Sequence, residues 1–497
     1  MKLLNLKMSC VSVVVALMLS LSCNPDKLDL LPHGPTEANF FAQESDFSKA
    51  VYGIYSKLSD FYWYNAGSSL VPMWFLEGDD ITTNASSEPF EVFGPIQPSN
   101  GSVSYMYQNL YVQIARANVV LEKIAEVKDG IYTTPNLKSY HKGEALFLRG
   151  LAYYHLWNYY GTAPLRNERV TSADQFTPSP TSGTELLDQA IADFKEAATL
   201  LPQAWGDADR GRATANSANG MVGKSLVFRA SATKTTADYT EALAAFAKLS
   251  GLTLVPVFED NFAFDTENNA ESLFEFQASQ PFAFDNVWLS NDFDNAIGSM
   301  SIFWGYYNNN YALFGQSRWF ATPKLVSAFD AGDPRIPVTL ATADRTINKY
   351  VVRDKYTQSG VASANNPRLL RYADVLLLKA EAILQSGGST SEAIGLINQV
   401  RARARAGGAV PSDFSTSESD KAKIMQWIMD ERFRELAGEG QRWFDLRRWH
   451  LQGIITLNNA FFNSNVPMAF DASKHLLMPI PNSELDVNPN MRQNAGY

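Results

Sequence analysis

Apolar side chains recur at intervals of three and four residues along most of the chain, the spacing that places them on one face of an α-helix. The first such stretch carries Phe47, Val51, Ile54, Tyr55 and Leu58. Longer stretches with the same spacing begin near residue 105 and continue, with interruptions, to residue 436. We therefore predict helices over residues 44–58, 105–124, 145–156, 185–200, 213–231, 239–249, 324–329, 370–385, 391–406 and 419–436.

Successive helices of this kind predict stacked helical hairpins. Gly438 and Gly440 supply a permissive backbone that ends one helix before the next begins. The strict signature of a tetratricopeptide repeat is missing, so we predict a mainly α fold in which tetratricopeptide-like helical hairpins form a scaffold. The remaining regular structure is predicted to be short strands at 252–255 and 273–277 and an extended segment at 476–481.

Two parts of the chain interrupt the helical spacing, at about 61–103 and 251–319. Both are rich in aromatic residues, asparagine and aspartate. A long irregular stretch in a helical chain is usually functional or disordered, and dense aromatics favour an ordered, functional one. We predict that these two loop-rich parts form a ligand-binding region.

The composition of the two parts matches the chemistry of a sugar. A sugar ring has C–H groups on one face and hydroxyls around its edge, so a glycan site combines flat aromatic rings with amides and carboxylates. The alternative is that each aromatic belongs to the core of an irregular domain. The glycan-binding candidates are Trp63, Tyr64, Trp74, Asp79, Asp80, Trp288, Trp304, Tyr306, Tyr307 and Asn309.

The N-terminus has the features of an export signal. Lys2 and Lys7 precede the mostly apolar run 11–21, which is too short to span a bilayer. Ser22 and Cys23 then resemble a bacterial lipoprotein cleavage site. We predict a signal peptide over 1–22 and a lipidated Cys23 that begins an N-terminal tether over 23–35. The alternative is an ordinary secretory signal that leaves Cys23 as a lone thiol.

Charge and cysteine content exclude several classes of partner. The formal net charge is −10, and loss of a leader that carries two lysines and no acid takes it to −12. This charge disfavours nucleic acid and anionic membrane surfaces. The only cysteines are Cys10 and Cys23, so the body of the protein has no disulfide and no cysteine metal site.

Catalytic and cofactor motifs are weak. Asp79 and Asp80 are adjacent, which on most backbones points the two side chains apart, whereas glycosidase carboxylates flank one bond. No nucleophile or zinc motif occurs, and we predict no catalytic residue and no cofactor. Calcium at 292–295 is a minor alternative, because Ala296 and Ile297 depart from the calcium-loop pattern.

Charged and aromatic residues are packed most densely at 430–450. Pairing with arginine keeps a carboxylate ionised, which is the wrong state for a general acid. We therefore favour a structural ion network over a catalytic centre. Its members are Glu431, Arg432, Glu435, Arg442, Asp445 and Arg448.

The run from Glu431 to Trp449 closely resembles the C-terminal signature of the SusD/RagB family, which are outer-membrane nutrient-binding lipoproteins of Bacteroidetes. Further segments resemble the same family in the same order: Asp333-Pro334-Arg335, residues 371–377, Pro479-Ile480-Pro481 and residues 493–497. The resemblance is specific from residue 333 onward. Before that residue it rests on the leader and the general organisation.

The resemblance implies a single SusD-like body over 36–497. Its helical scaffold would cover about 36–60, 104–250 and 320–460, and its C-terminal tail about 470–497. It also implies a cell-surface lipoprotein of the outer membrane that captures an oligosaccharide or polysaccharide without catalysis. The glycan would pass to a TonB-dependent, SusC-like outer-membrane transporter. Two alternatives stay open, a glycoside hydrolase and a helical-repeat component that binds protein or peptide.

Overall fold

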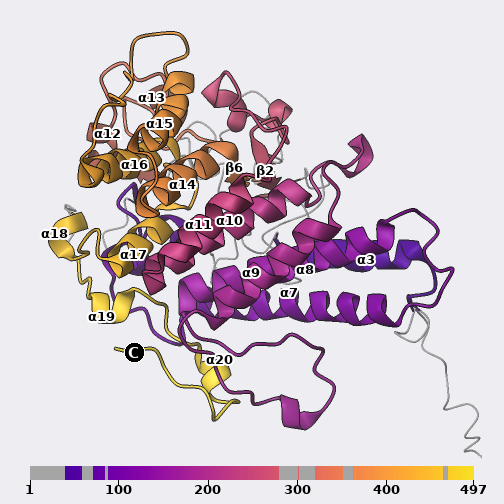
Figure 1. The fold of residues 1–497 in the computed structure, drawn as a ribbon. Coiled ribbons are helices and arrows are strands. Elements are labelled where there is room, and N and C mark those ends of the chain that lie inside the picture. The colour runs from indigo at the N-terminus through magenta and orange to yellow at the C-terminus, as the bar shows by residue number, and fades with distance from the viewer. Residues whose placement is uncertain are drawn as a thin grey trace, which may run out of the picture.

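The computed structural model describes residues 40–58, 71–83, 88–278, 300–301, 319–350, 362–363, 365–462 and 468–497. Helices dominate these residues, which confirms the predicted mainly α class (Figure 1). Among the residues described, no helix is both long and apolar enough to cross a membrane.

The first half of the chain forms a layer of long helices that lie side by side (Figure 1). They are α3 (Glu44–Tyr55), α7 (Gly101–Glu126), α8 (Leu137–Tyr160), α9 (Glu185–Leu200), α10 (Ala215–Thr233) and α11 (Thr236–Phe246). Each helix from α7 to α11 packs against the next one, and α3 lies against α7 and α8. Because α8 is buried along nearly its whole length, it is the centre of this layer.

Polar caps determine where several helices begin. The Asn100 side chain accepts hydrogen bonds from the N–H groups of Ser102 (2.9 Å) and Val103 (3.2 Å) at the start of α7. The Thr214 hydroxyl accepts from the N–H of Ser217 (3.2 Å) at the start of α10. These bonds satisfy backbone donors that have no partner inside the helix.

The second half adds four longer helices and several short elements. The longer ones are α14 (Tyr372–Gln385), α15 (Thr390–Ala404), α16 (Lys421–Glu435) and α17 (Arg442–Gln452). Helix α14 packs against α11, α15 and α16, and α17 returns to α10. The short helices among the described residues are α5 (Val71–Phe75), α6 (Pro89–Val92), α12 (Pro323–Ala328), α13 (Ile336–Thr339), α18 (Asn459–Phe462), α19 (Ala472–His475) and α20 (Asn482–Leu485).

The connection between α16 and α17 is the predicted glycine hinge. Gly438 and Gly440 both have a φ of +72°, which glycine adopts without steric cost. Helix α16 ends before this pair and α17 begins after it, so the predicted break between the two helices is confirmed.

The described strands form three small antiparallel sheets of two strands each. They pair β1 (Ile81–Thr83) with β4 (Trp319–Ala321), β2 (Ser272–Glu275) with β6 (Arg368–Arg371), and β3 (Met300–Ser301) with β5 (Ala362–Ser363). The strand expected at 273–277 corresponds to β2.

The strand expected at 252–255 is wrong. Residues 252–255 form no strand. The nearby strand β2 pairs with β6 instead. The backbone groups of 252–255 bond elsewhere: the N–H of Thr253 donates to the carbonyl of Ala270 (3.0 Å), and the N–H of Val255 donates to the Glu271 carboxylate (3.0 Å).

Candidate functional site

The sheet of β1 and β4 brings the two aromatic-rich parts of the chain together. Ile81 pairs with Ala321, and Thr83 pairs with Trp319, so a segment of the first part lies beside the end of the second. The contact continues past the strands, because the N–H and hydroxyl of Thr322 donate to the carbonyls of Asp80 (2.9 Å) and Asp79 (2.7 Å). Two stretches more than 200 residues apart in sequence are therefore joined by one small sheet. We call this sheet of β1 and β4 the base of the site.

Most glycan-binding candidates lie outside the described residues. These are Trp63, Tyr64, Trp288, Trp304, Tyr306, Tyr307 and Asn309, together with Cys23 and the possible calcium segment 292–295. The roles assigned to them stay predictions. Trp74, Asp79 and Asp80 are described: Asp79 and Asp80 directly precede β1, and Trp74 lies on α5.

Trp74, on α5, is almost fully buried, with 9% of its surface exposed. Its ring makes edge-to-face contacts with His155 (5.3 Å between centroids) and Phe444 (6.1 Å). The backbone of Gly440 approaches the indole so closely that an added Cβ would lie 2.9 Å from the ring. Trp74 thus packs against α8, α17 and the hinge. A role of Trp74 in glycan contact stays a prediction.

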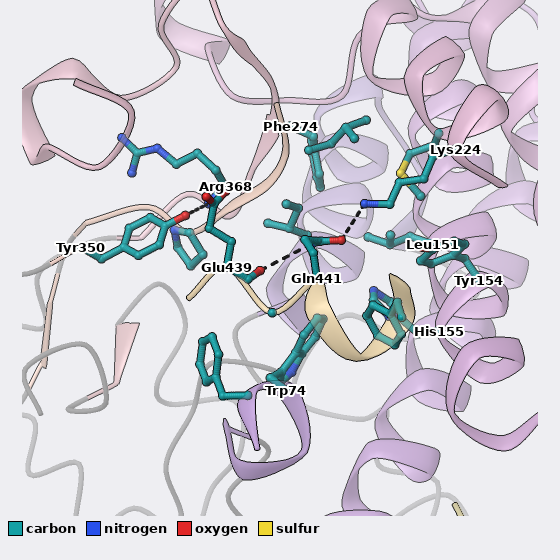
Figure 2. Close-up of a pocket in the computed structure, with 17 residues that line it drawn as sticks. Trp74, Leu151, Tyr154, His155, Lys224, Phe274, Tyr350, Arg368, Glu439 and Gln441 are labelled. Carbon is teal, nitrogen blue, oxygen red and sulfur yellow. Dashed lines mark hydrogen bonds between the residues drawn. The ribbon is translucent and has the colours of Figure 1, made fainter. Parts of the chain in front are cut away.

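Trp74 lines an internal cavity of about 40 Å³ (Figure 2). On its polar side, Lys224 Nζ donates to Gln441 (2.7 Å) and to the Asp374 carboxylate (2.7 Å). Burial, with a smaller effect of Lys224, lowers the pKa of His155 to about 3, which keeps this side chain neutral. Ligand pockets usually measure about 300–1,000 Å³, so this cavity has room for a few water molecules and not for a sugar.

Asp79 is buried and paired with two cations. Its carboxylate contacts the Arg442 guanidinium (2.5 Å) and Lys324 Nζ (2.6 Å). Burial alone would raise the pKa of Asp79, but the two cations outweigh it and the net pKa is lowered. The carboxylate is therefore held ionised inside the protein, where it joins β1 to α17 and α12.

Asp80 is also buried, but no cation among the described residues forms an ion pair with its carboxylate. One oxygen accepts the N–H of Gly438 (3.2 Å) in the hinge. Burial and the neighbouring Asp79 charge raise the pKa of Asp80 from 3.8 to about 6. The two adjacent carboxylates thus have different partners, and both support the base of the site. Direct contact of either with a glycan stays a prediction.

A buried ion network lies behind the hinge. Glu435 accepts hydrogen bonds from Arg335 (3.0 Å), Arg371 (2.6 Å) and Arg403 (2.5 Å), and all four side chains are nearly inaccessible to solvent. We call the following set the Glu435 network: Glu271, Arg335, Arg371, Arg401, Arg403, Glu431, Glu435 and Glu439. The surrounding guanidinium groups outweigh burial and lower the pKa of Glu435.

Arg432, Asp445 and Arg448 form a second buried group with carboxylates of α14. Arg432 contacts Asp445 (2.7 Å) across the hinge and Asp374 (2.7 Å) on α14. Arg448 contacts Asp445 (2.9 Å) and Glu381 (2.5 Å). Every carboxylate in these pairs is held against arginine, which favours the structural interpretation over a catalytic acid.

Several members of the Glu435 network could not be recognised from the sequence. Glu271 lies 100 residues from its partner Arg371, and Arg335 lies 100 residues from Glu435. Helical spacing reveals only neighbours three or four residues apart, so it could not reveal these pairs. The available signal was that Arg335 and Arg371 fall in segments that resemble the SusD/RagB family.

Comparison with known proteins agrees with this architecture. The profile described as "SusD family" matches residues 330–497, and the one described as "Starch-binding associating with outer membrane" matches residues 78–225. SusD-like protein P2 of Formosa agariphila is 27% identical over 92% of this chain and 94% of its own length. Both profiles are models of SusD-like proteins, so the resemblance of the chain to the SusD/RagB family is confirmed.

Solved structures show the same fold. A SusD homolog from Bacteroides thetaiotaomicron superposes with a TM-score of 0.76 at 21% identity, covering 93% of this chain and 99% of its own. Surface glycan-binding protein A from the same organism, in complex with laminarihexaose, gives a TM-score of 0.71 at 19% identity, covering 91% of this chain and 99% of its own.

Glu435→Gln is expected to lower the free energy of unfolding by about 3–5 kcal/mol, because the exchange leaves three buried guanidinium groups short of one negative charge. The measurement is urea unfolding followed by circular dichroism. The matched control is Glu196→Gln, which removes one charge of the exposed pair with Lys142 and should cost less than about 1 kcal/mol. Equal losses in the two variants would contradict a central role for the network.

Asp80→Asn is expected to stabilise the protein at pH 7.5 and to lose this advantage as the pH falls to 4.5. The raised pKa means that the folded state binds more protons than the unfolded state between about pH 4 and 6, so the Asp80 contribution to stability falls as the pH rises. Two pKa units correspond to about 2–3 kcal/mol as an upper limit.

Thermal unfolding of both proteins from pH 4.5 to 8 measures the effect of Asp80→Asn. Asp207→Asn, at a highly exposed carboxylate, is the control and should change stability by less than about 0.5 kcal/mol at every pH. A constant difference between Asp80→Asn and the wild type would rule out titration of Asp80 in this range.

Proposed function

We propose that this protein captures an oligosaccharide or polysaccharide at the cell surface and does not cleave it. The observation that carries the proposal is the pairing of β1 with β4, which gives the two aromatic-rich parts of the chain a common base. Similarity to the SusD/RagB family supports it, as does the fold shared with a surface glycan-binding protein solved in complex with laminarihexaose. Aromatic rings presented by both parts would stack on sugar rings, and neighbouring amides would bind hydroxyls.

The base is suited to present such loops. Asp79, with Arg442 and Lys324, fixes β1 against α17 and α12, and Gly438 binds Asp80. A binding surface whose support is already ordered loses less conformational entropy when the ligand binds. The loops can therefore supply specificity while the helical scaffold supplies rigidity.

Isothermal titration of the soluble protein, lacking residues 1–23, against plant, algal, fungal and host polysaccharides tests the proposal. We expect one polysaccharide class to bind, and Trp304→Ala to weaken that binding at least about tenfold, the change that loss of about 1.4 kcal/mol produces. Phe176→Ala is the control, because it removes an exposed ring (62% exposed) outside both aromatic-rich parts.

The other outcomes of the titration separate the alternatives. Release of shorter sugars from the bound polysaccharide would identify a glycoside hydrolase. Absence of binding to every polysaccharide, together with binding to a peptide library, would identify a helical-repeat protein that recognises peptides. In either case the proposal of non-catalytic glycan capture fails.

We propose further that the mature protein is a lipoprotein of the outer membrane and works with a TonB-dependent, SusC-like transporter. In this arrangement residues 1–22 are removed, Cys23 carries the lipid, residues 23–35 act as a tether, and residues 36–497 form the body. The family description that mentions association with the outer membrane supports this location. A glycan held on the loops would then be passed to the transporter.

Affinity purification of the tagged full-length protein from its own cells tests both the anchor and the partner. The expected result is recovery from the outer membrane together with a TonB-dependent barrel. Cys23→Ala should shift the protein to the soluble fraction, because the variant lacks the thiol that carries the lipid anchor. Purification without a barrel would exclude the transporter partner, and unchanged membrane association of Cys23→Ala would exclude lipidation at that residue.

A further inference from the structure

A separate aromatic cluster lies among the described residues, on three different segments. Tyr52 comes from α3, Tyr140 from α8, and Trp205 from the connection between α9 and α10, which projects beyond the helix layer (Figure 1). The guanidinium of Arg212 lies over the Trp205 ring at 3.8 Å from its centroid and 5.4 Å from that of Tyr52. Tyr140 meets the Trp205 ring edge-on at 5.4 Å.

Arg212 fixes this cluster to the interior. Two of its nitrogens donate to the buried carboxylate of Glu144 (2.7 and 2.6 Å), and a third donates to Asp209 (2.8 Å). The indole N–H of Trp205 donates to the carbonyl of Ala213 (2.8 Å). The connection between α9 and α10 is therefore held in one conformation, and its aromatic ring is ordered before any ligand binds.

The outer side of the cluster is open to solvent. Tyr52 is 46% exposed, and Trp205 is partly exposed. The Tyr52 hydroxyl donates to one oxygen of Asp209 (3.4 Å), and Asp207 nearby is almost fully exposed. Exposed rings beside carboxylate oxygens are the groups that contact the C–H face and the hydroxyls of a sugar.

The charges of the cluster indicate a neutral ligand. Arg212 is neutralised by Glu144 and Asp209, and Arg210 is paired with Asp207 (2.6 Å). Each of these two guanidinium groups already has a carboxylate partner. A sulfated or uronic-acid glycan would therefore meet acidic groups without an unpaired cation from either arginine.

The cluster borders a described segment of the second aromatic-rich part. Gly211 packs against Gln277, so closely that a Cβ at Gly211 would lie 2.1 Å from that side chain. Tyr55, on the same helix as Tyr52, accepts the N–H of Ala213 (2.9 Å) and packs against Phe274 on β2. From β2 the chain continues through Gln277 into residues 279–299.

We propose that Tyr52, Trp205 and Asp209 form a further glycan-contact site, which takes neutral hexopyranose units of a chain long enough to extend beyond the predicted loop site. This inference rests on the proposed function. Two linked contacts on one polysaccharide raise its apparent affinity, whereas a short oligosaccharide occupies only one of them.

Titrations of paired long and short ligands test the further site. The probes are laminarin with laminarihexaose first, and then any other polysaccharide that binds the wild type, with its own hexasaccharide. Tyr52→Ala should weaken polysaccharide binding roughly tenfold and leave hexasaccharide binding unchanged. Tyr52→Phe keeps the ring and should stay within about twofold of the wild type.

Two further variants control for folding and for exposed rings in general. Trp205→Leu should reproduce the loss seen in Tyr52→Ala, with circular dichroism confirming that both variants fold. Phe176→Ala should bind as the wild type does.

The outcomes distinguish this inference from the proposed function. If Trp304→Ala abolishes binding while Tyr52→Ala and Trp205→Leu bind polysaccharide like the wild type, the further site is excluded and glycan capture stands. If the wild type binds no polysaccharide, both proposals fall together. Equal weakening of long and short ligands by Tyr52→Ala would also overturn the proposal, because it would place Tyr52 in a single shared site.

Discussion

The pairing of buried charges around Glu435 is the constraint on which the rest of the structure depends. Its carboxylate meets guanidinium groups of Arg335, Arg371 and Arg403, which come from distant parts of the chain. Removal of a charge from water costs several kcal/mol per ion, so each charge requires its partners in place. We infer that the network favours one arrangement of α14, α15 and α16 over alternatives that would leave a charge unpaired.

The hinge after α16 connects the Glu435 network to the candidate site. Gly438 donates to Asp80, Arg442 pairs with Asp79, and Gly440 packs against Trp74. Each contact joins the C-terminal helices to the segment that leads into β1. The position of the β1–β4 sheet is therefore fixed by buried contacts with residues of the C-terminal helices.

The cluster around Trp205 contains a similar arrangement, in which a buried pair of a carboxylate and an arginine holds a loop. A buried carboxylate, Glu144, holds Arg212, and Arg212 in turn orders an exposed aromatic connection. In both places an arginine links the helical scaffold to a loop. In such an arrangement the scaffold supplies the contacts that hold the loop in place.

The sequence by itself determined the helices, the hinge and the resemblance to the SusD/RagB family. Apolar spacing predicts helices because it reflects contacts within one turn, and Gly438 and Gly440 predict a break because their backbone freedom is local. Aromatic composition also indicated which two parts of the chain could bind a sugar, although most of those residues lie outside the described structure.

Only the tertiary structure decided which distant segments meet. It paired β1 with β4, turned Asp79 and Asp80 inward, gave Glu435 its partners and brought the rings of Tyr52 and Trp205 to the same arginine. These contacts join residues separated by tens to hundreds of positions, and no local spacing records them. Burial and long-range charge pairing arise from the packing of the whole chain, which is why the sequence could name the candidates but could not assign their partners.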